Sequence, residues 1–416
     1  MPSQPRIAIV GGGPAGLTMG VLLQKHHIPF TIFERRPKPT REELAEPSGM
    51  LDLHEGSGLE VIKECGLYDE FIPLTGECSE DMILTDRNGN VLYKVPGNRS
   101  SPEISRNNLS SLLLSRIPPE NVKWSHRLLS AVKPSPSNPS ETELDFGIHG
   151  KHTFDLVVGA DGAWSRVRNL LTTTRPYYTG KQTVTFTIKH ISAKYPHLAA
   201  LVGSGSFSAM GNRHAVVSQR GPLDSARVYL MLTHPDKDFG ASSGLAEKPA
   251  SAAKDALLGD DALLGSFGPL VKDLVATACD EEAADHPGAN LDIRPLHALP
   301  YGTAWAHQQG VTLVGDAAHV MLPNGEGVNQ AMFDALLLCR AVVEAYEAAG
   351  GDVGAFNSAF DPLLKEYETA LVQRAVETGK DTEVLIEHMF GNDDAAYSFA
   401  DFLKKAVEQH QSKLEG

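Results

Sequence analysis

The chain has 416 residues, which is enough for two or three domains with sizeable cores. Its 37 lysines and arginines against 52 aspartates and glutamates give a net charge of −15, which argues against nucleic acid and anionic membranes as partners. No stretch approaches the roughly 18 apolar residues of a membrane span, and the four cysteines lack CxxC spacing, so we expect a reduced cytosolic protein without disulfides or a metal site.

A glycine-rich turn close to the N-terminus is the strongest signal in the chain. Residues 7–10 are predicted to form a buried strand and residues 17–26 a helix, and a G-x-G-x-x-G pattern separates them, with Gly11, Gly13 and Gly16. The first glycine permits a tight turn, the second lets the backbone approach a pyrophosphate, and the third lets the helix pack on the strand. Pro14 and Ala15 open the helix, whose N-terminal N–H groups can bind phosphate. Because the strand begins so early, we expect no signal peptide.

An acidic residue after the second predicted strand indicates that the turn belongs to a dinucleotide site. Residues 29–33 form the next apolar run, and Glu34, followed by Arg35, can accept both hydroxyls of a ribose. A carboxylate at this point disfavours a 2′-phosphate, so we expect the tightly bound nucleotide to be FAD or NAD rather than NADP. A glycine-rich surface turn without a ligand is the alternative, and the succession of strand, turn, helix and acid argues against it.

The following segments continue this first domain. Residues 37–47 are predicted to form a loop because they are charged and rich in proline. Periodic apolar residues predict helices over 55–65 and 106–116, and strands begin near residue 122 and over 154–159.

A second domain is predicted where apolar and polar residues alternate. Such runs occupy residues 184–188, 215–218 and 228–232, and Asn88-Gly89 predicts a further hairpin over 82–95. These signals favour an antiparallel sheet inserted into the first domain, followed by helices over 240–285.

The C-terminal part returns to the first domain and then leaves it. A buried strand over 311–314 and a long helix over 328–349 are followed from residue 360 by an amphipathic helical segment that we expect to bridge the domains. The sequence thus predicts an α/β fold in three parts: a discontinuous Rossmann-like dinucleotide-binding domain (1–76, 101–175, 290–358), an inserted antiparallel substrate-binding domain (77–100, 176–289) and a C-terminal bridging helical segment (359–416).

Two later motifs change the expected nucleotide to a flavin. Residues 158–168 contain Asp161-Gly162, and residues 313–329 contain Gly315-Asp316 followed by a glycine-rich loop. Together with the first turn, these motifs resemble the FAD-dependent monooxygenases of the aromatic-hydroxylase group, over residues 6–340. The resemblance implies bound FAD and a pocket between the flavin and the inserted sheet.

The resemblance also implies roles for the motif residues. Asp161 would lie where the flavin pyrophosphate and a nicotinamide cofactor approach; a strand-ending turn capped by this aspartate is the alternative, and both can hold at once. Gly315 and Asp316 would contact the ribityl chain, and the loop 323–329 would pass under the isoalloxazine, with contacts from Gly327, Val328 and Asn329. This loop is one residue shorter than is usual in the family, and it carries Glu326 where glutamine or a small residue is frequent.

Other residues resemble particular members of the group. Arg106 resembles an arginine that contacts the flavin from the start of a helix, and Leu51-Asp52-Leu53-His54 resembles the tetracycline-inactivating branch, in which the aspartate lies near the flavin. Arg213 resembles an arginine that faces the drug in that branch, and Lys189, which stands where the branch has an amide, is a second candidate for substrate contact. A solvated arginine at a helix or strand end and a helix-capping Asp52 are the alternatives.

The expected reaction is hydroxylation of an electron-rich aromatic or enolic small molecule, polycyclic as in tetracyclines and other polyketides. The resemblance implies transient NADPH or NADH as electron donor, O₂ as co-substrate and a flavin C4a-hydroperoxide as oxidant. No catalytic side chain and no metal is then required, His319 is expected to be structural, and we expect a monomer. Baeyer–Villiger oxidation, epoxidation and a non-catalytic FAD-binding protein are the alternatives.

Overall fold

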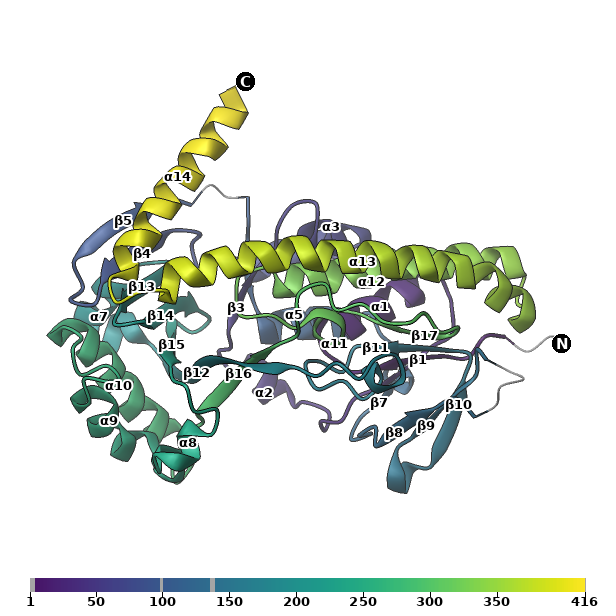
Figure 1. Cartoon of the computed structure of the whole chain (residues 1–416), viewed down its shortest axis with the longest axis horizontal. Coiled ribbons are helices and arrows are strands. Elements are labelled where there is room, and N and C mark those ends of the chain that lie inside the picture. Colours follow the sequence, from purple (N-terminus) through teal and green to yellow (C-terminus); the bar gives the residue numbers. More distant parts are fainter. Residues whose placement is uncertain (1–3, 98–99, 135–138, 416) are drawn as a thin grey trace.

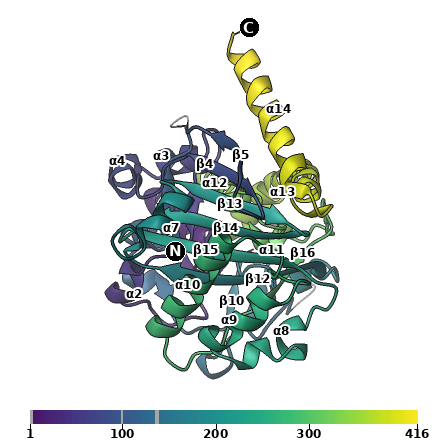
Figure 2. The same cartoon turned by 90° about the vertical axis from the view of Figure 1, so that its left-hand side faces the viewer.

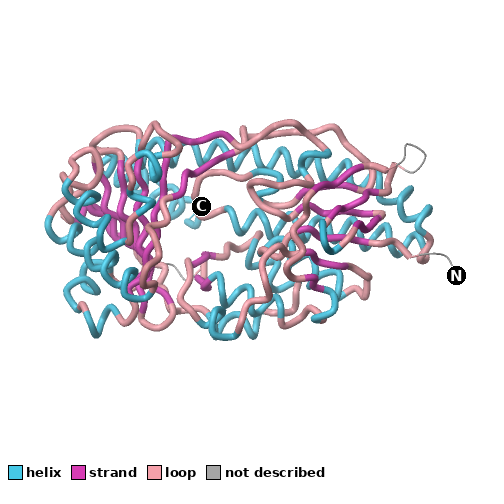
Figure 3. Tube along the Cα trace, turned by 90° about the horizontal axis from the view of Figure 1, so that it is seen from below, coloured by secondary structure: helices cyan, strands magenta, loops and turns pink. Residues whose placement is uncertain are grey.

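The computed structural model describes residues 4–97, 100–134 and 139–415, which form an elongated molecule with β-sheets toward both ends (Figures 1 and 3). One end is built on a five-stranded parallel sheet in the order β17 (Val311–Leu313), β11 (Leu156–Gly159), β1 (Ile7–Val10), β2 (Thr31–Phe33) and β7 (Val122–Lys123). Its central strands are apolar and fully buried, as expected for a parallel sheet covered on both faces.

Helices from distant parts of the chain cover this sheet. Their apolar faces share one core with its strands, and they are α1 (Pro14–Lys25), α3 (Gly58–Glu64), α5 (Arg106–Leu114) and α12 (Gly327–Ala349). A three-stranded antiparallel sheet lies beside it, with β8 (Ser130–Val132), β9 (Thr142–Asp145) and β10 (Lys151–Phe154).

The other end is a seven-stranded sheet. Its order is β16 (Arg294–Ala298), β12 (Tyr177–Ile188), β15 (Ser225–Thr233), β14 (His214–Gly221), β13 (Ser206–Gly211), β4 (Met82–Asp86) and β5 (Val91–Val95). The predicted hairpin over 82–95 is confirmed as β4 and β5, and β4 pairs with β13 of this sheet. That pairing is parallel, so the sheet is mixed rather than wholly antiparallel.

One face of the seven-stranded sheet packs on a layer of helices. The second core lies between them, and the helices are α6 (Ile191–Lys194), α7 (Pro196–Val202), α8 (Phe239–Ser242), α9 (Ala250–Gly259) and α10 (Pro269–Asp285). Helices α8, α9 and α10 stand in front of the sheet in Figure 2. Strand β16 belongs to this sheet through its pairing with β12, so residues 294–298, which we expected in the first domain, lie in the second.

The expected bridging helix is α13 (Val353–Phe390), which runs along the molecule from one sheet to the other (Figure 1). Phe356 and Phe360 lie in the first core, and Phe390 lies in a third core against the seven-stranded sheet. The helix begins at residue 353, before the boundary predicted at 359, because Asp352 caps it. After a short turn, α14 (Ala395–Glu415) packs on β4, β5 and β13 and then projects from the body (Figure 2).

Two short elements connect the ends. Residues 37–47, predicted as a loop, contain the helix α2 (Arg41–Ala45), which a reciprocal capping box of Thr40 and Glu43 stabilises. The antiparallel pair β3 (Met50–Asp52) and β6 (Glu103–Ser105) lies between the two large sheets, with α4 (Tyr68–Phe71) following α3.

No helix in the described part of the chain is long and apolar enough to cross a membrane.

Candidate cofactor and substrate site

The glycine-rich turn between β1 and α1 has the geometry that its spacing predicts. Gly11 has φ +116°, and a Cβ there would lie 2.1 Å from the carbonyl oxygen of Ala160. A Cβ at Gly16 would lie 2.0 Å from the carbonyl oxygen of Gly11, so both positions require glycine for close packing. Gly13 differs, since no described atom lies within 4 Å of its Cβ position, and no described side chain caps α1. The turn therefore leaves open space at the N-terminus of α1, as a phosphate needs.

Glu34 lies buried at the end of β2 beside this turn. Its Oε2 accepts a hydrogen bond of 2.7 Å from the backbone N–H of Gly12, and its Oε1 accepts one of 2.9 Å from that of Arg36. Oε1 also accepts from Nε of Arg36 at 3.1 Å, so these bonds fix the carboxylate, and Oε2 keeps a lone pair for a ribose hydroxyl. Arg35 is exposed, and its side chain makes no hydrogen bond or ion pair with the described residues.

Asp161 caps the turn after β11. Its carboxylate accepts from the hydroxyl of Ser165 at 2.5 Å and from the backbone N–H of Arg166 at 2.7 Å. Burial raises the pKa of this carboxyl, and these hydrogen bonds act against the rise. The neighbouring Arg168 is buried and donates to the carbonyl oxygen of Ala317, which joins this motif to the Gly315-Asp316 motif.

Asp316 starts the short helix α11 (Asp316–His319) and is exposed, although Ala317 and Ala318 beside it are buried. Its carboxylate has no hydrogen bond or ion pair with the described residues. A Cβ at Gly315 would lie 3.5 Å from that of Ala15, so the motif stands against the glycine-rich turn. An unpartnered carboxylate at this place fits the hydroxyls of a ribityl chain.

A buried ionic network stabilises the loop that contains Gly315 and Asp316. Asp334 of α12 accepts from the backbone N–H of Gly315 at 3.0 Å, lies 2.7 Å from Nε2 of His319 and accepts from Arg374 of α13 at 2.9 Å. Burial disfavours the charge on His319, but Asp334 outweighs this effect and raises the pKa of the imidazole. The side chain of His319 is thus held inside the protein, as expected for a structural residue.

The start of α12 is tied to the end of β3. Asn329 is fully buried, accepts from the backbone N–H of His54 at 2.9 Å and donates to the carbonyl oxygen of Asp52 at 2.9 Å. Gly327 has no described atom within 4 Å of its Cβ position, whereas Val328 is half-buried against the first core. The loop 323–329 therefore meets β3, and Asn329 holds the backbone of both segments, while its contact with a flavin stays a prediction.

Two groups near β3 and β6 were not singled out by their chemistry in the sequence. His54 lies between Asp52 and Glu326, and Glu103 stands opposite Asp52 in the β3–β6 ladder. Burial raises the pKa of Glu103 to about 7, and its Oε2 is buried without a hydrogen-bond partner among the described residues. The sequence signal that could have identified these two groups is the alternation of charged and apolar residues around each of them. Arg106, the first residue of α5, is exposed, and its guanidinium has no partner among the described residues.

One face of the seven-stranded sheet packs on the helix layer, and the opposite face, which we call the inner face, is turned toward the β3–β6 pair. Val184, Val228 and Leu230 point to the helix layer and are buried, whereas their neighbours on the opposite face are partly exposed. Thr185, Tyr229 and Val217 stand side by side on that inner face in three neighbouring strands. A Cβ at Gly49, just before β3, would lie 2.7 Å from the hydroxyl of Tyr229, so the sheet reaches the β3–β6 pair.

The two predicted substrate residues lie at the margins of the sheet. Arg213 is exposed in the β13–β14 turn at φ +61°, and its Nε donates to the carbonyl oxygen of Phe390 at 3.3 Å. Lys189 forms ion pairs of 2.9 Å with Glu46 and 3.1 Å with Asp285. Both contacts give these residues a structural role, and their contact with substrate stays a prediction.

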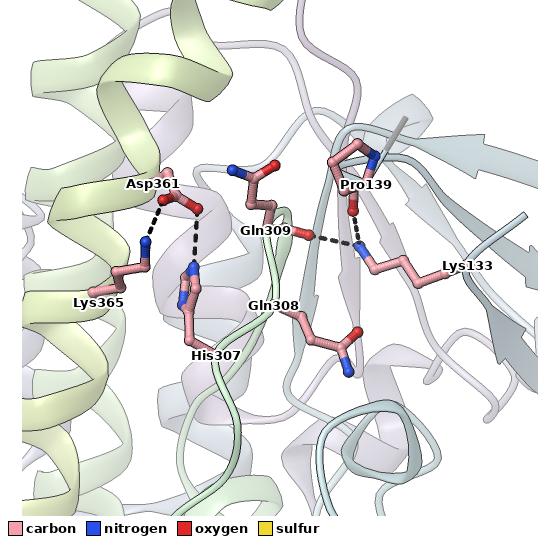
Figure 4. Close-up of a pocket in the computed structure, with 7 residues that line it drawn as sticks. All are labelled: Lys133, Pro139, His307, Gln308, Gln309, Asp361 and Lys365. Carbon is pink, nitrogen blue, oxygen red and sulfur yellow. Dashed lines mark hydrogen bonds and ion pairs between the residues drawn. The ribbon is translucent and has the colours of Figure 1, made fainter. Parts of the chain in front are cut away.

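A separate pocket of about 480 Å³ lies beside α13, between this helix, the segment before β17 and the chain just after β8 (Figure 4). Its ionic groups already bind protein atoms: Asp361 pairs with His307 and Lys365, and Lys133 donates to the carbonyl oxygen of Gln309. None of the predicted site residues lines it. No cluster of metal-ligating side chains occurs among the described residues.

Comparison with known proteins agrees with this geometry. Residues 5–269 and 267–354 match a family profile described as an FAD binding domain. The monooxygenase penA of Penicillium thymicola is 34% identical over 410 residues, which cover 91% of this chain and 94% of that protein.

Solved structures share the fold. HpxO of Klebsiella pneumoniae, complexed with FAD and uric acid, has a TM-score of 0.73 at 18% identity and covers 96% of this chain and 93% of its own. The tetracycline destructase Tet(55) has a TM-score of 0.62 at 18% identity, and the match covers 91% of this chain and 89% of its own.

Proposed function

The chain belongs to the family of FAD-dependent monooxygenases of the aromatic-hydroxylase type, and we propose that it hydroxylates an electron-rich aromatic or enolic small molecule with NADPH or NADH as transient electron donor. The observation that carries the proposal is the meeting of two distant motifs, the glycine-rich turn and Gly315-Asp316, at one open place. Gly13 borders empty space, Asp316 lacks a partner among the described residues, and Gly315 packs against Ala15 between them.

We propose that the residues along this line hold FAD from end to end. Glu34 would bind the adenosine ribose, the N-terminus of α1 at Gly13 the pyrophosphate, and Asp316 the ribityl hydroxyls. When bound and reduced, the flavin supplies the activation of O₂ and the transfer of one oxygen atom to substrate. Arg106, which is exposed beside Tyr229, and the loop 323–329 would border the ring.

The protein's own contribution is to exclude water and to orient the substrate. The inner face of the seven-stranded sheet offers the hydroxyls of Thr185 and Tyr229 and the apolar surface of Val217. Burial raises the pKa of Tyr229, so its hydroxyl keeps its proton and can donate to a phenolate or enolate oxygen. A flat, polycyclic substrate suits this mixture of aromatic, aliphatic and hydroxyl groups.

The test is turnover under ¹⁸O₂ with a panel of polycyclic phenols and enols, tetracyclines and uric acid. We expect yellow protein, substrate-stimulated oxidation of NADPH or NADH, and a product heavier by one ¹⁸O atom. Product NMR separates hydroxylation from ester or epoxide formation. Peroxide formation that no substrate stimulates would contradict the proposed monooxygenation, and yellow protein without nicotinamide oxidation would favour a non-catalytic flavoprotein.

A further inference from the structure

Three ionisable side chains from two distant segments meet at the end of β3. Nε2 of His54 lies 2.9 Å from Oδ2 of Asp52, and Nδ1 of the same ring lies 3.0 Å from Oε1 of Glu326. We call this group the Asp52–His54–Glu326 triad. Its side chains are 37%, 28% and 36% exposed, so the triad borders open space on one side.

The backbone around the triad is fixed. Asn329 bonds to the backbone of β3 and of the following turn, and it also donates to the carbonyl oxygen of Gly325 at 3.3 Å. Gly325 has φ +85°, and a Cβ there would lie 3.5 Å from Oδ2 of Asp52. Hydrogen bonds of Asn329 hold both segments in place. The imidazole is therefore fixed between its two carboxylates more firmly than in an ion pair between flexible surface side chains.

The two contacts with carboxylates favour a positively charged ring. Ionised carboxylates only accept hydrogen bonds, and a neutral imidazole donates from one nitrogen alone, so both contacts are hydrogen bonds only when His54 is an imidazolium. The hydrogen bonds to Asp52 and Glu326 raise the pKa of His54 to about 10, against the effect of burial. Glu103, the cross-strand neighbour of Asp52, is a further ionisable group near the triad. The triad thus carries one positive and two negative charges at neutral pH.

The triad lies at the end of the proposed FAD site. From the glycine-rich turn, Gly315 and Asp316 lead through the loop 320–326 to Glu326, and β3 borders the seven-stranded sheet at Gly49. With the pyrophosphate at Gly13 and the ribityl chain at Asp316, the isoalloxazine end of FAD falls beside this loop and β3. Reduction of the flavin by hydride adds two electrons and one proton, so the reduced ring carries a negative charge that nearby charges stabilise or oppose.

We propose that the Asp52–His54–Glu326 triad sets the reduction potential of the bound flavin, with the positive charge of His54 offsetting the carboxylate that Glu326 brings to the flavin. The inference rests on the proposed function, because it requires FAD in the site. His54 acts as a positioning residue: it locks the loop 323–329 onto β3 and balances its charge.

The test measures the midpoint potential of the flavin in purified holoprotein variants by dye equilibration. Glu326→Gln removes a negative charge and should raise the potential, whereas His54→Gln removes the positive charge and should lower it. The double variant restores the net charge of the triad, and its potential should return close to that of the unmodified protein. Glu55→Gln, which removes an exposed carboxylate paired with Lys63 just beyond the triad, is the matched control and should leave the potential unchanged.

Each outcome decides between roles. A triad with only a structural role would weaken FAD retention in both single variants without shifting the potential in opposite directions, and that result overturns the inference. If His54→Gln does not fold, Glu326→Gln compared with Glu55→Gln decides alone, and equal potentials overturn it. Protein that binds no FAD, even on reconstitution, contradicts the proposed function instead.

Discussion

Asp316 is exposed at the start of α11 while the residues that follow it are buried, and its carboxylate is without a partner among the described residues. If this carboxylate accepts hydrogen bonds from the ribityl chain, Asp316→Asn should weaken FAD binding. Bonds to a charged group contribute about 1.5–3 kcal/mol, so we expect a Kd for FAD roughly 10- to 100-fold higher by fluorescence titration of apoprotein. Asp255→Asn, an exposed aspartate of α9, is the control for loss of one charge. Equal affinities in the two variants would remove Asp316 from the site.

Glu103 should make the stability of the protein depend on pH. Its folded-state pKa is about 7 because of burial, whereas the ordinary value is 4.5, so between these pH values the folded state binds more protons than the unfolded state. The free energy of unfolding should therefore fall as pH rises through this window, by about 1 kcal/mol between pH 6 and pH 8. Glu103→Gln cannot ionise and should lose this part of the pH dependence in urea unfolding. Parallel pH profiles of the two proteins would show that Glu103 is not the group responsible.

At the level of residues, the sequence predicted what depends on local spacing. The glycines at 11, 13 and 16 and the acid at 34 follow from a strand–turn–helix unit whose parts are neighbours in the chain. The environment of His54 could not be predicted in this way, because Glu326 lies 272 residues further on and only the fold brings the two together. The role expected for Asp161 rested on resemblance, and the structure adds the capping bonds that the alternative interpretation expected.

The turn between β1 and α1 allows a test at the level of an element, because two of its glycines face different surroundings. Gly16→Ala places a Cβ against the carbonyl oxygen of Gly11 and should destabilise the fold by about 1–3 kcal/mol. Gly13→Ala meets open space, so the free energy of unfolding of the apoprotein should change by less than about 1 kcal/mol while FAD binding weakens. Urea unfolding without FAD and titration with FAD measure the two effects. A Gly13→Ala variant with unchanged FAD affinity would contradict phosphate binding at this turn.

Elements were predicted best where one periodic pattern spans them, as in α12 and in the hairpin of β4 and β5. The helix α2 was missed because proline and charge suggested a loop, although Thr40 and Glu43 carry the spacing of a capping box. The parallel pairing of β4 with β13 and the place of β16 beside β12 were also missed. Strand partners depend on contacts between distant segments, which the pattern within one strand does not define.

The molecule as a whole is joined lengthwise by α13, which is anchored in two different cores. Phe356 lies at one end among residues of the five-stranded sheet and its helices, and Phe390 lies at the other end against Leu84 and Met231. The side chains are 0% and 1% exposed, and the same truncation can be made at each end. Replacing either phenylalanine by alanine should lower the free energy of unfolding by about 3–5 kcal/mol. Because the same side chain is truncated in both variants, a difference between them reflects where the residue lies in the molecule.

If α13 joins two units that can open separately, the two truncations should loosen different parts of the chain. In native-state hydrogen exchange read by mass spectrometry, Phe390→Ala should speed exchange in β13, β14 and α14 and leave β1 and β11 protected, because the lost contacts lie only in the third core. Phe356→Ala should give the reverse pattern and should also weaken FAD retention, since its core supports the glycine-rich turn. Equal exchange over both sheets in both variants would mean that the molecule unfolds as one cooperative unit, with α13 as part of a single core.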